Sequence, residues 1–335
     1  MRIVATSLLA IWALVATGCG RGRAGVADAN GVFPIRTITM KDCALAPWLV
    51  TEKLGYFKQE KIRIVYTGET QPALVIPSIL NGNNDVSSSH PNGLAVARAG
   101  GAKITAVFRG GIDPPPDADP RLRHMFWYVN PQKYPNVKTF ADLKNIPGKL
   151  KFSTITVTIC TDFLTNRLFQ KAGIPLDKAE WVSMPDIQAI QALKQGLIDV
   201  AGVHPPFYKG MDDAGARSIG DSLDAGLGAA GGVGFYFFRD DFIQQHPDVV
   251  RRFIRAIGRG QAWIDQHPAQ AAQWTSEAIG VRITGNHYYP LKNEYYESEV
   301  WPWIKDLEDR NVIPRGSIKP SDLITTQFVD NQSFL

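Results

Sequence analysis

A short loop in this sequence places an imidazole and two aromatic rings where a small molecule could bind. Residues 204–208 read His-Pro-Pro-Phe-Tyr and follow an apolar run of strand length that ends at Val203. The imidazole of His204 can form hydrogen bonds, and the rings of Phe207 and Tyr208 can stack on a ligand. Ligands of open α/β sheets bind outside the carboxyl ends of strands. We therefore predict that this loop forms one wall of a ligand site.

Four other loops carry hydroxyl, amide, thiol or imidazole groups directly after predicted strands. Hydroxyl groups both donate and accept hydrogen bonds, so Ser89 and Thr158 suit the recognition of ligand oxygen atoms, although each could equally be a cap or turn residue. We predict that these loops face residues 204–208 across one cleft. The candidate ligand-binding residues are Cys43, Ala44, Thr70, Gln71, Ser88, Ser89, His90, Thr156, Thr158, Cys160, Thr161, His204, Phe207 and Tyr208.

The histidines and cysteines among these candidates allow more than one interpretation. His90 and His204 each precede a proline, and a pair of imidazoles could coordinate a metal, hydrogen-bond a ligand or bond only to backbone. Cys43 and Cys160 could present two thiols to a soft metal across a cleft. Two small, semi-buried free cysteines are the simpler interpretation. We assign no metal, no cofactor and no catalytic residue from the sequence.

A repeated strand–loop–helix pattern must position these loops. Residues 35–40, 63–66 and 85–89 are predicted strands, each followed by a loop and a helical segment, and 104–109 is a fourth strand. This order is typical of a parallel sheet with helices on its faces. The sequence thus predicts an α/β fold for the first part of the chain.

The pattern is repeated in a second lobe. Pro131 and Pro135 mark a break that fits a crossover, and strands are expected at 125–129, 150–154, 180–184 and 198–203. Thr161 is a candidate N-cap for a helix that ends before Gly173. Asp186 is a candidate N-cap for a second helix, which ends at Gly196. An aromatic strand at 235–239 would cross back, and helices would follow at 246–267, 269–279 and 288–310. We predict one lobe from 35–128 plus 236–335 and the other from 129–235.

The first 34 residues predict secretion. Arg2 and the apolar run that follows form a signal peptide, residues 1–18, which is too short to span a bilayer. The sequence Ala16-Thr17-Gly18-Cys19 is similar to a bacterial lipobox, in which Cys19 would be lipidated; ordinary signal cleavage nearby is the alternative. Residues 19–34 then form a flexible tether.

Composition excludes several other classes of protein. The chain has 335 residues, which is enough for two lobes, and a formal charge of +4 without a Lys/Arg block, so we expect no nucleic-acid partner. If Cys19 is lipidated, two cysteines remain, which is not a disulfide framework. The nucleophile-elbow, zinc-protease and P-loop motifs are missing from the sequence.

Several motifs together resemble one family of transport proteins. The tether, the run at 54–62, the segments 83–86 and 95–102, and the block 195–200 with Pro206 and Phe207 are similar to extracytoplasmic solute-binding proteins of ABC importers. The most similar branch is the nitrate/sulfonate/taurine and thiamine-pyrimidine-precursor group. The resemblance covers roughly residues 35–310. It implies the type II periplasmic-binding-protein fold, with two α/β lobes joined by two crossovers around a ligand cleft.

The resemblance also implies function. We expect a monomeric lipoprotein in the periplasm or at the cell surface, held to the membrane by its lipid anchor alone, that passes a small organic or sulfonate-like ligand to an ABC permease. The family often has Gly-Ser before the second-lobe helix, whereas this chain has Thr156 to Thr161 without glycine. A pyrimidine-precursor synthase-like enzyme on the same fold and a tethered ligand sensor remain alternatives.

Overall fold

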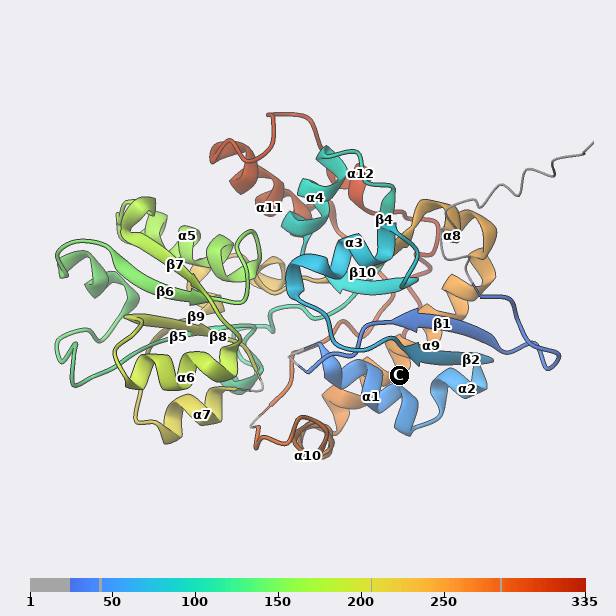
Figure 1. The fold of residues 1–335 in the computed structure, drawn as a ribbon, viewed down its shortest axis with the longest axis horizontal. Coiled ribbons are helices and arrows are strands. Elements are labelled where there is room, and N and C mark those ends of the chain that lie inside the picture. The colour runs from blue at the N-terminus through green and yellow to red at the C-terminus, as the bar shows by residue number, and fades with distance from the viewer. Residues whose placement is uncertain (1–24, 42–43, 206, 284) are drawn as a thin grey trace, which may run out of the picture.

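The computed structural model describes residues 25–41, 44–205, 207–283 and 285–335, and its strands divide into two lobes (Figure 1). In Figure 1 the lobe on the right contains both the blue and cyan first part of the chain and the orange and red last part, whereas the green and yellow middle part forms the lobe on the left. The chain therefore passes between the lobes twice, as the two-lobed prediction requires.

The first lobe contains two neighbouring sheets. Strands β1 and β2 pair in parallel, and the central strand β10 pairs antiparallel with β3 on one side and β4 on the other. The strands are β1 (Phe33–Thr37), β2 (Ile62–Tyr66), β3 (Val86–Ser89), β4 (Ile104–Arg109) and β10 (Phe235–Arg239). The α-helices are α1 (Leu45–Lys53), α2 (Tyr56–Gln59), α3 (Val75–Leu80), α4 (Pro91–Ala99), α8 (Asp240–Gln245), α9 (Pro247–Gln266), α10 (Pro268–Ile279), α11 (Glu297–Asp309) and α12 (Pro320–Leu323).

The second lobe is built on one five-stranded sheet with the order β7-β6-β8-β5-β9. The strands are β5 (Phe126–Val129), β6 (Leu150–Thr154), β7 (Ala179–Ser183), β8 (Val200–Val203) and β9 (Arg217–Asp221). The α-helices are α5 (Cys160–Ala172), α6 (Asp186–Lys194) and α7 (Tyr208–Asp213). Short 3₁₀ turns complete the chain at η1 (Pro72–Leu74), η2 (Pro120–Leu122), η3 (Phe140–Asn145), η4 (Leu176–Lys178), η5 (Ser222–Ala225) and η6 (Gly228–Gly231).

The predicted boundary between the lobes at 128/129 is wrong, because it cuts through β5. This strand pairs antiparallel with β8 and with β9, so all of it belongs to the second lobe. The connections are therefore residues 110–125, between β4 and β5, and 222–234, between β9 and β10. The break at Pro131 lies inside the second lobe.

One further prediction of secondary structure is wrong, and one strand was not predicted. The helix expected at 288–310 begins only at Glu297, and in the segment before it Tyr288 forms an isolated β-bridge with Ile112. Strand β9 (Arg217–Asp221) is not among the strands that the sequence predicted. Its pairing with β5 shows that tertiary context formed the strand there despite weak local propensity.

Apolar side chains bury the helices against these sheets. In the first lobe, Trp48 of α1 lies edge-on to Tyr236 of β10 and also contacts Phe253 of α9. The core cluster around Trp127 and Phe163 includes residues of both lobes and of α11. Within the part of the chain that the structure describes, no helix is both long enough and apolar enough to cross a bilayer.

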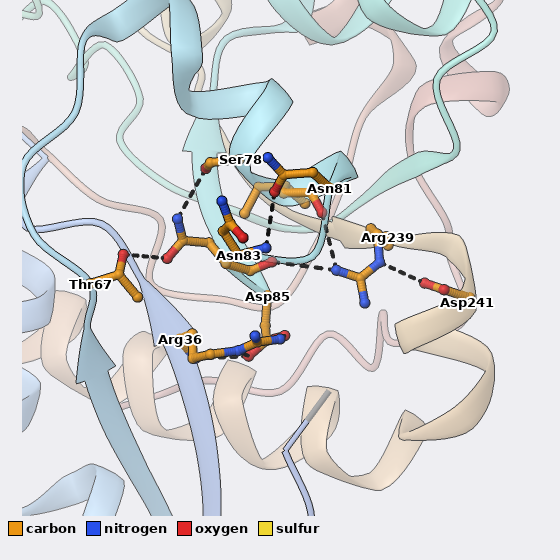
Figure 2. A network of polar contacts seen from close by, with 10 residues as sticks. Arg36, Thr67, Ser78, Asn81, Asn83, Asp85, Arg239 and Asp241 are labelled. Atoms are coloured by element: carbon orange, nitrogen blue, oxygen red, sulfur yellow. Dashed lines mark hydrogen bonds and ion pairs between the residues drawn. The ribbon is translucent and has the colours of Figure 1, made fainter. Parts of the chain in front are cut away.

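A polar network joins the two sheets of the first lobe, as Figure 2 shows. The fully buried carboxylate of Asp85 accepts hydrogen bonds from the backbone N, Nε and Nη2 of Arg36 at 2.9, 2.9 and 2.5 Å. Arg36 belongs to β1, and Asp85 directly precedes β3. The hydrogen bonds to Asp85 raise the pKa of Arg36. The pair thus fixes how the two sheets meet.

We expect Arg36→Met to lower the free energy of unfolding by about 3 kcal/mol, because it leaves the Asp85 carboxylate buried without its cation. Urea denaturation followed by circular dichroism measures this loss. Arg121→Met is the matched control, since Arg121 pairs with Asp119 at an exposed site, and we expect it to cost less than about 1 kcal/mol. Equal losses in the two variants would contradict the assigned role of the buried pair.

Candidate functional site

A cavity of about 710 Å³ lies between the lobes. Its walls come from the exit loops of β1, β2 and β3 in the first lobe, from residues 155–160, His204 and Phe207 in the second lobe, and from the two connections. The segment that precedes α11 adds His287 and Tyr289. This is the edge of the sheets at which the sequence predicted the ligand loops would meet.

Most candidate residues line this cavity. They are Ala44, Thr70, Ser88, Ser89, His90, Thr156, Thr158, Cys160, His204 and Phe207. Cys43 lies outside the described residues. Gln71, Thr161 and Tyr208 do not line the cavity: Gln71 precedes η1, Thr161 is fully buried in α5, and the Tyr208 hydroxyl donates to the carbonyl oxygen of Arg123 at 2.5 Å. Whether the lining residues bind a ligand remains a prediction.

A chain of three polar side chains forms the floor of the cavity. The Sγ atom of Cys160 lies 2.9 Å from Nε2 of His204, and Nδ1 of His204 lies 2.7 Å from Oδ2 of Asp186. The same oxygen accepts the backbone N–H of His204 at 2.9 Å. All three side chains are buried. Asp186 was predicted to cap α6, but Pro185 holds the cap position and the Asp186 carboxylate instead orients His204.

Local structure places Cys160 at the first turn of α5. The predicted N-cap, Thr161, is wrong: Ile159 takes that position, and its backbone N–H donates to Asp162 Oδ1 at 2.7 Å. In the preceding loop Thr158 has a φ of 63°, a left-handed conformation that costs a β-branched residue about 1–2 kcal/mol. Unpaired N–H groups at a helix start favour a thiolate over a thiol.

Three more histidines surround Cys160. His90 comes from the end of β3, His124 from the start of β5, and His287 from the segment before α11. One ligand atom each from His90, His124 and Cys160 lies within 4.8 Å of the others. Nδ1 of His124 lies 3.3 Å from Nδ1 of His287, and Nδ1 of His90 lies 2.8 Å from the carbonyl oxygen of Val233. Four of the six histidines of the chain thus gather at one point.

Neighbouring groups hold these histidines in place. The ring of His90 stacks on Trp303 of α11, with ring centroids 5.2 Å apart and planes 8° apart. Gly232 in the second connection lets the chain approach His124, because a Cβ there would lie 2.9 Å from the Cβ of His124 and 2.6 Å from the backbone N of Asp113. Any side chain at this position would push the histidine away from the floor.

Burial and mutual contacts shift the pKa values of the cluster in opposite directions. Burial lowers the pKa of His124 to about 4 and that of His287 well below its usual range, so both imidazoles are neutral. Burial raises the pKa of the Cys160 thiol, but His90 and His204 more than offset this and hold it well below its usual value. Burial also lowers the pKa of His204, whereas Cys160 and Asp186 raise it well above normal. These opposite directions favour transfer of the Cys160 thiol proton to His204.

Sequence reasoning missed His124 and His287 for different reasons. His124 lies at the amino end of β5, but β5 runs antiparallel to β8, and Phe126 pairs with Val203. The start of one strand and the end of the other therefore meet at the cavity. His287 lies just before a stretch that we expected to be helical. The repeated occurrence of histidine near predicted strand ends was the one available signal.

Asp265 of α9 supports the segment that carries His287 and Tyr289. Its Oδ2 accepts the backbone N–H of Tyr289 at 3.3 Å, while its Oδ1 is buried and has no hydrogen-bond partner among the described residues. Burial raises the pKa of this carboxyl from 3.8 to about 8. The cleft-lining segment therefore rests on a carboxyl group that is neutral at physiological pH.

Comparison with known proteins identifies the family to which this sequence is similar. A family model described as NMT1/THI5 like matches residues 43–271. Among curated proteins, no sequence match is found.

Solved structures that are similar in fold include the following three proteins. The aliphatic sulphonate binding protein SsuA from Escherichia coli aligns at 16% identity with a TM-score of 0.65, over 90% of this chain and 94% of that one. The nitrate-binding protein NrtA from Synechocystis PCC 6803 aligns at 12% identity with a TM-score of 0.67, over 84% and 83%. The desulfurization enzyme DSZB aligns at 10% identity with a TM-score of 0.60, over 88% and 96%. At these identities the likeness concerns the fold, and it confirms the predicted periplasmic-binding-protein architecture.

We expect the stability of the protein to fall as pH rises from about 4 to about 8, in part because Asp265 must ionise while buried. The native state keeps this proton up to its raised pKa, whereas the unfolded chain loses it near 3.8, so over this window the native state binds more protons and rising pH favours unfolding. Asp265→Asn removes the ionisation. Its melting temperature should exceed that of the wild type by several degrees at pH 8 and by much less at pH 5. Equal differences at the two pH values would contradict this assignment.

Proposed function

This chain belongs to the NMT1/THI5-like family, and from that premise we propose that it is the extracytoplasmic solute-binding component of an ABC importer. The observation that carries the proposal is the cavity of about 710 Å³ between the lobes, whose walls come from both of them. This volume suits a small molecule. Contacts to both lobes would favour a closed state, since a ligand shifts a conformational equilibrium only by binding one state better.

The ligand we propose is a small organic or sulfonate-like molecule. The upper walls of the cavity present hydroxyl groups, among them Thr70, Ser88 and Thr156, beside apolar side chains such as Met40 and Phe207. Hydroxyl groups can donate to sulfonate or nitro oxygens, and the apolar wall suits a carbon skeleton. The fold is shared with SsuA, which binds an aliphatic sulphonate, and with NrtA, which binds nitrate, and this supports the proposed class of ligand.

The proposed cellular setting follows from the same function. The protein would be a monomer in the periplasm or at the cell surface, anchored through lipidated Cys19, and its partners would be the ligand and an inner-membrane permease. Residues 1–24 lie outside the described part of the chain, so this part of the proposal rests on the lipobox-like sequence.

A thiol enzyme is a second candidate, favoured by one observation. Cys160, His204 and Asp186 are connected in the order of a nucleophile, a base and the group that orients the base, with distances of 2.9 and 2.7 Å. The desulfurization enzyme DSZB shares the fold. We favour binding without catalysis, because the surrounding histidines are not needed for such a triad.

Native mass spectrometry of the gently purified chain is the test of the binding function. We expect a small molecule to copurify, and the identified compound to raise the melting temperature when it is added back. A ligand present at 100 times its dissociation constant stabilises the native state by about 2.7 kcal/mol. Substrate turnover by the wild-type protein, lost in Cys160→Ala, would instead support the thiol enzyme.

We expect Thr156→Trp to abolish ligand-induced stabilisation, because an indole at this partly exposed wall residue would fill the cavity. Thermal shift with the copurified compound measures the effect. Thr326→Trp is the matched control: Thr326 is exposed and does not line the cavity, so its ligand response should equal that of the wild type. An undiminished response in Thr156→Trp would place the ligand elsewhere.

A further inference from the structure

We propose that the floor of the cavity is a transition-metal site in which one thiolate and three imidazoles coordinate a single borderline or soft first-row ion, such as Zn²⁺ or Cu⁺. The ligands are Cys160, His90, His124 and His204. This inference rests on the proposed binding function, whose ligand class it sharpens. The sequence alone predicted no metal, because it did not indicate that His124 lies beside Cys160.

The hydrogen bonds of the imidazoles leave the same nitrogen free on each ring. Nδ1 of His204 is engaged by Asp186, Nδ1 of His90 by the carbonyl oxygen of Val233, and Nδ1 of His124 by His287. Each ring can then offer Nε2. Nε2 of His204 already lies 2.9 Å from the Cys160 sulfur, and Nε2 of His124 is buried without a hydrogen-bond partner among the described residues.

These outer contacts are the kind that metal-binding histidines make. A ligating imidazole almost always donates its other N–H to a carboxylate, a carbonyl oxygen or a comparable acceptor, which fixes its tautomer and its orientation. The carboxylate of Asp186 and the carbonyl of Val233 are such acceptors, and Nδ1 of neutral His287 can be a third. A thiol enzyme would explain only the contact with Asp186.

The distances allow coordination after a small contraction. In a tetrahedral site, with Zn–S of ~2.3 Å and Zn–N of ~2.0–2.1 Å, neighbouring ligand atoms lie ~3.5 Å apart. The ligand atoms of His90, His124 and Cys160 lie within 4.8 Å of one another, and Sγ and Nε2 of His204 are closer than the tetrahedral spacing. A contraction of about 1 Å would therefore bring the ligand atoms of His90, His124 and Cys160 to tetrahedral spacing, and His204, which already contacts Sγ of Cys160, is the fourth candidate ligand.

The chemistry of the donors selects the ion. Thiolate and imidazole together favour Zn²⁺ and copper and disfavour Mg²⁺ and Ca²⁺, which prefer oxygen ligands. On binding, the ion replaces the proton held between Cys160 and His204, so that proton is released to solvent. One thiolate and three neutral imidazoles then leave a net charge of +1 on a site with Zn²⁺, next to the Asp186 carboxylate.

The ion would bridge the two lobes. His90 belongs to the first lobe and Cys160 and His204 to the second, while His124 lies at the end of the first connection. A cavity of about 710 Å³ is far larger than an ion requires, so space remains above the floor. The same site could therefore hold the ion together with an anionic or organic molecule that the ion helps to bind. Coordination from both sides would stabilise the closed arrangement.

Zn²⁺ and Co²⁺ titrations of the full chain, stripped of metal with a chelator, test the inference. We expect one equivalent of either ion to bind, with a thiolate-to-cobalt charge-transfer band in the near ultraviolet for Co²⁺. X-ray absorption of the Zn²⁺ form should show one sulfur at ~2.3 Å and nitrogens at ~2.0 Å. Cys160→Ser should remove the cobalt band and weaken Zn²⁺ binding by at least about 100-fold. Asp186→Asn, which changes only the partner of His204, should weaken it by about 10- to 100-fold.

The matched control is His267→Ala, which removes an exposed histidine outside the cluster and should leave metal affinity and spectrum unchanged. Circular dichroism melts of each variant show that it is folded. Failure to bind one equivalent, a spectrum without sulfur coordination, or unchanged affinity in Cys160→Ser would overturn the inference.

The outcomes separate the metal site from the binding function. If the stripped protein still binds its copurified organic compound and Thr156→Trp abolishes that binding, while Zn²⁺ does not bind, the binding function holds and the metal site fails. If Zn²⁺ binds through Cys160 but no small molecule stabilises the protein with or without it, the metal site holds and the organic ligand class fails. Turnover that needs Cys160 and is unaffected by a chelator would overturn the metal site in favour of the thiol enzyme.

Discussion

The contact between the sulfur of Cys160 and the imidazole of His204 is the constraint on which the cavity floor depends. It joins the first turn of α5 to the end of β8, and Asp186 extends it to the start of α6. Three segments of the second lobe thus meet at one buried polar point. Burying ionisable groups costs free energy unless they are paired, and here the sulfur, the imidazole and the carboxylate satisfy one another. Because the two groups interact, the pKa of the Cys160 thiol is lowered and the pKa of His204 is raised.

The sequence predicted the strands and the cleft better than their connections. Strands β4, β6 and β10 have the expected bounds, because apolar runs flanked by turn residues are a local signal. The boundary of the second lobe was wrong because the pairing partner of β5 is fixed only by tertiary contacts. For the same reason, residues recruited by antiparallel pairing, above all His124, could not be found from a rule about parallel strand ends. Tyr208 was wrongly predicted to line the cavity. Its position after a strand did not indicate the direction of its side chain.

The cavity concentrates features that lower stability. Thr158 holds a left-handed backbone conformation in the loop before Cys160, and Asp265 keeps a buried carboxyl group beneath the segment that carries His287. Away from the cavity, the three hydrogen bonds between Arg36 and Asp85 satisfy a fully buried carboxylate. Local strain and raised pKa values cluster at functional sites, where the surrounding fold maintains them. The position of Thr158 and Asp265 at one cavity agrees with placing function there.

The arrangement of the histidines connects binding to motion of the lobes. The chain passes between the lobes through residues 110–125 and 222–234, and both connections contact the cluster: His124 belongs to the first, and Val233 of the second accepts the hydrogen bond from His90. Gly232 lies against His124, so the two connections also touch each other at this point. A rotation of one lobe would change the spacing of His90 from Cys160 and with it the shape of the floor. A ligand that needs all of these atoms at once binds only one arrangement of the lobes. The ligand then stabilises this closed arrangement of the lobes. The size of the effect is set by how much more tightly the ligand binds the closed arrangement than the open one.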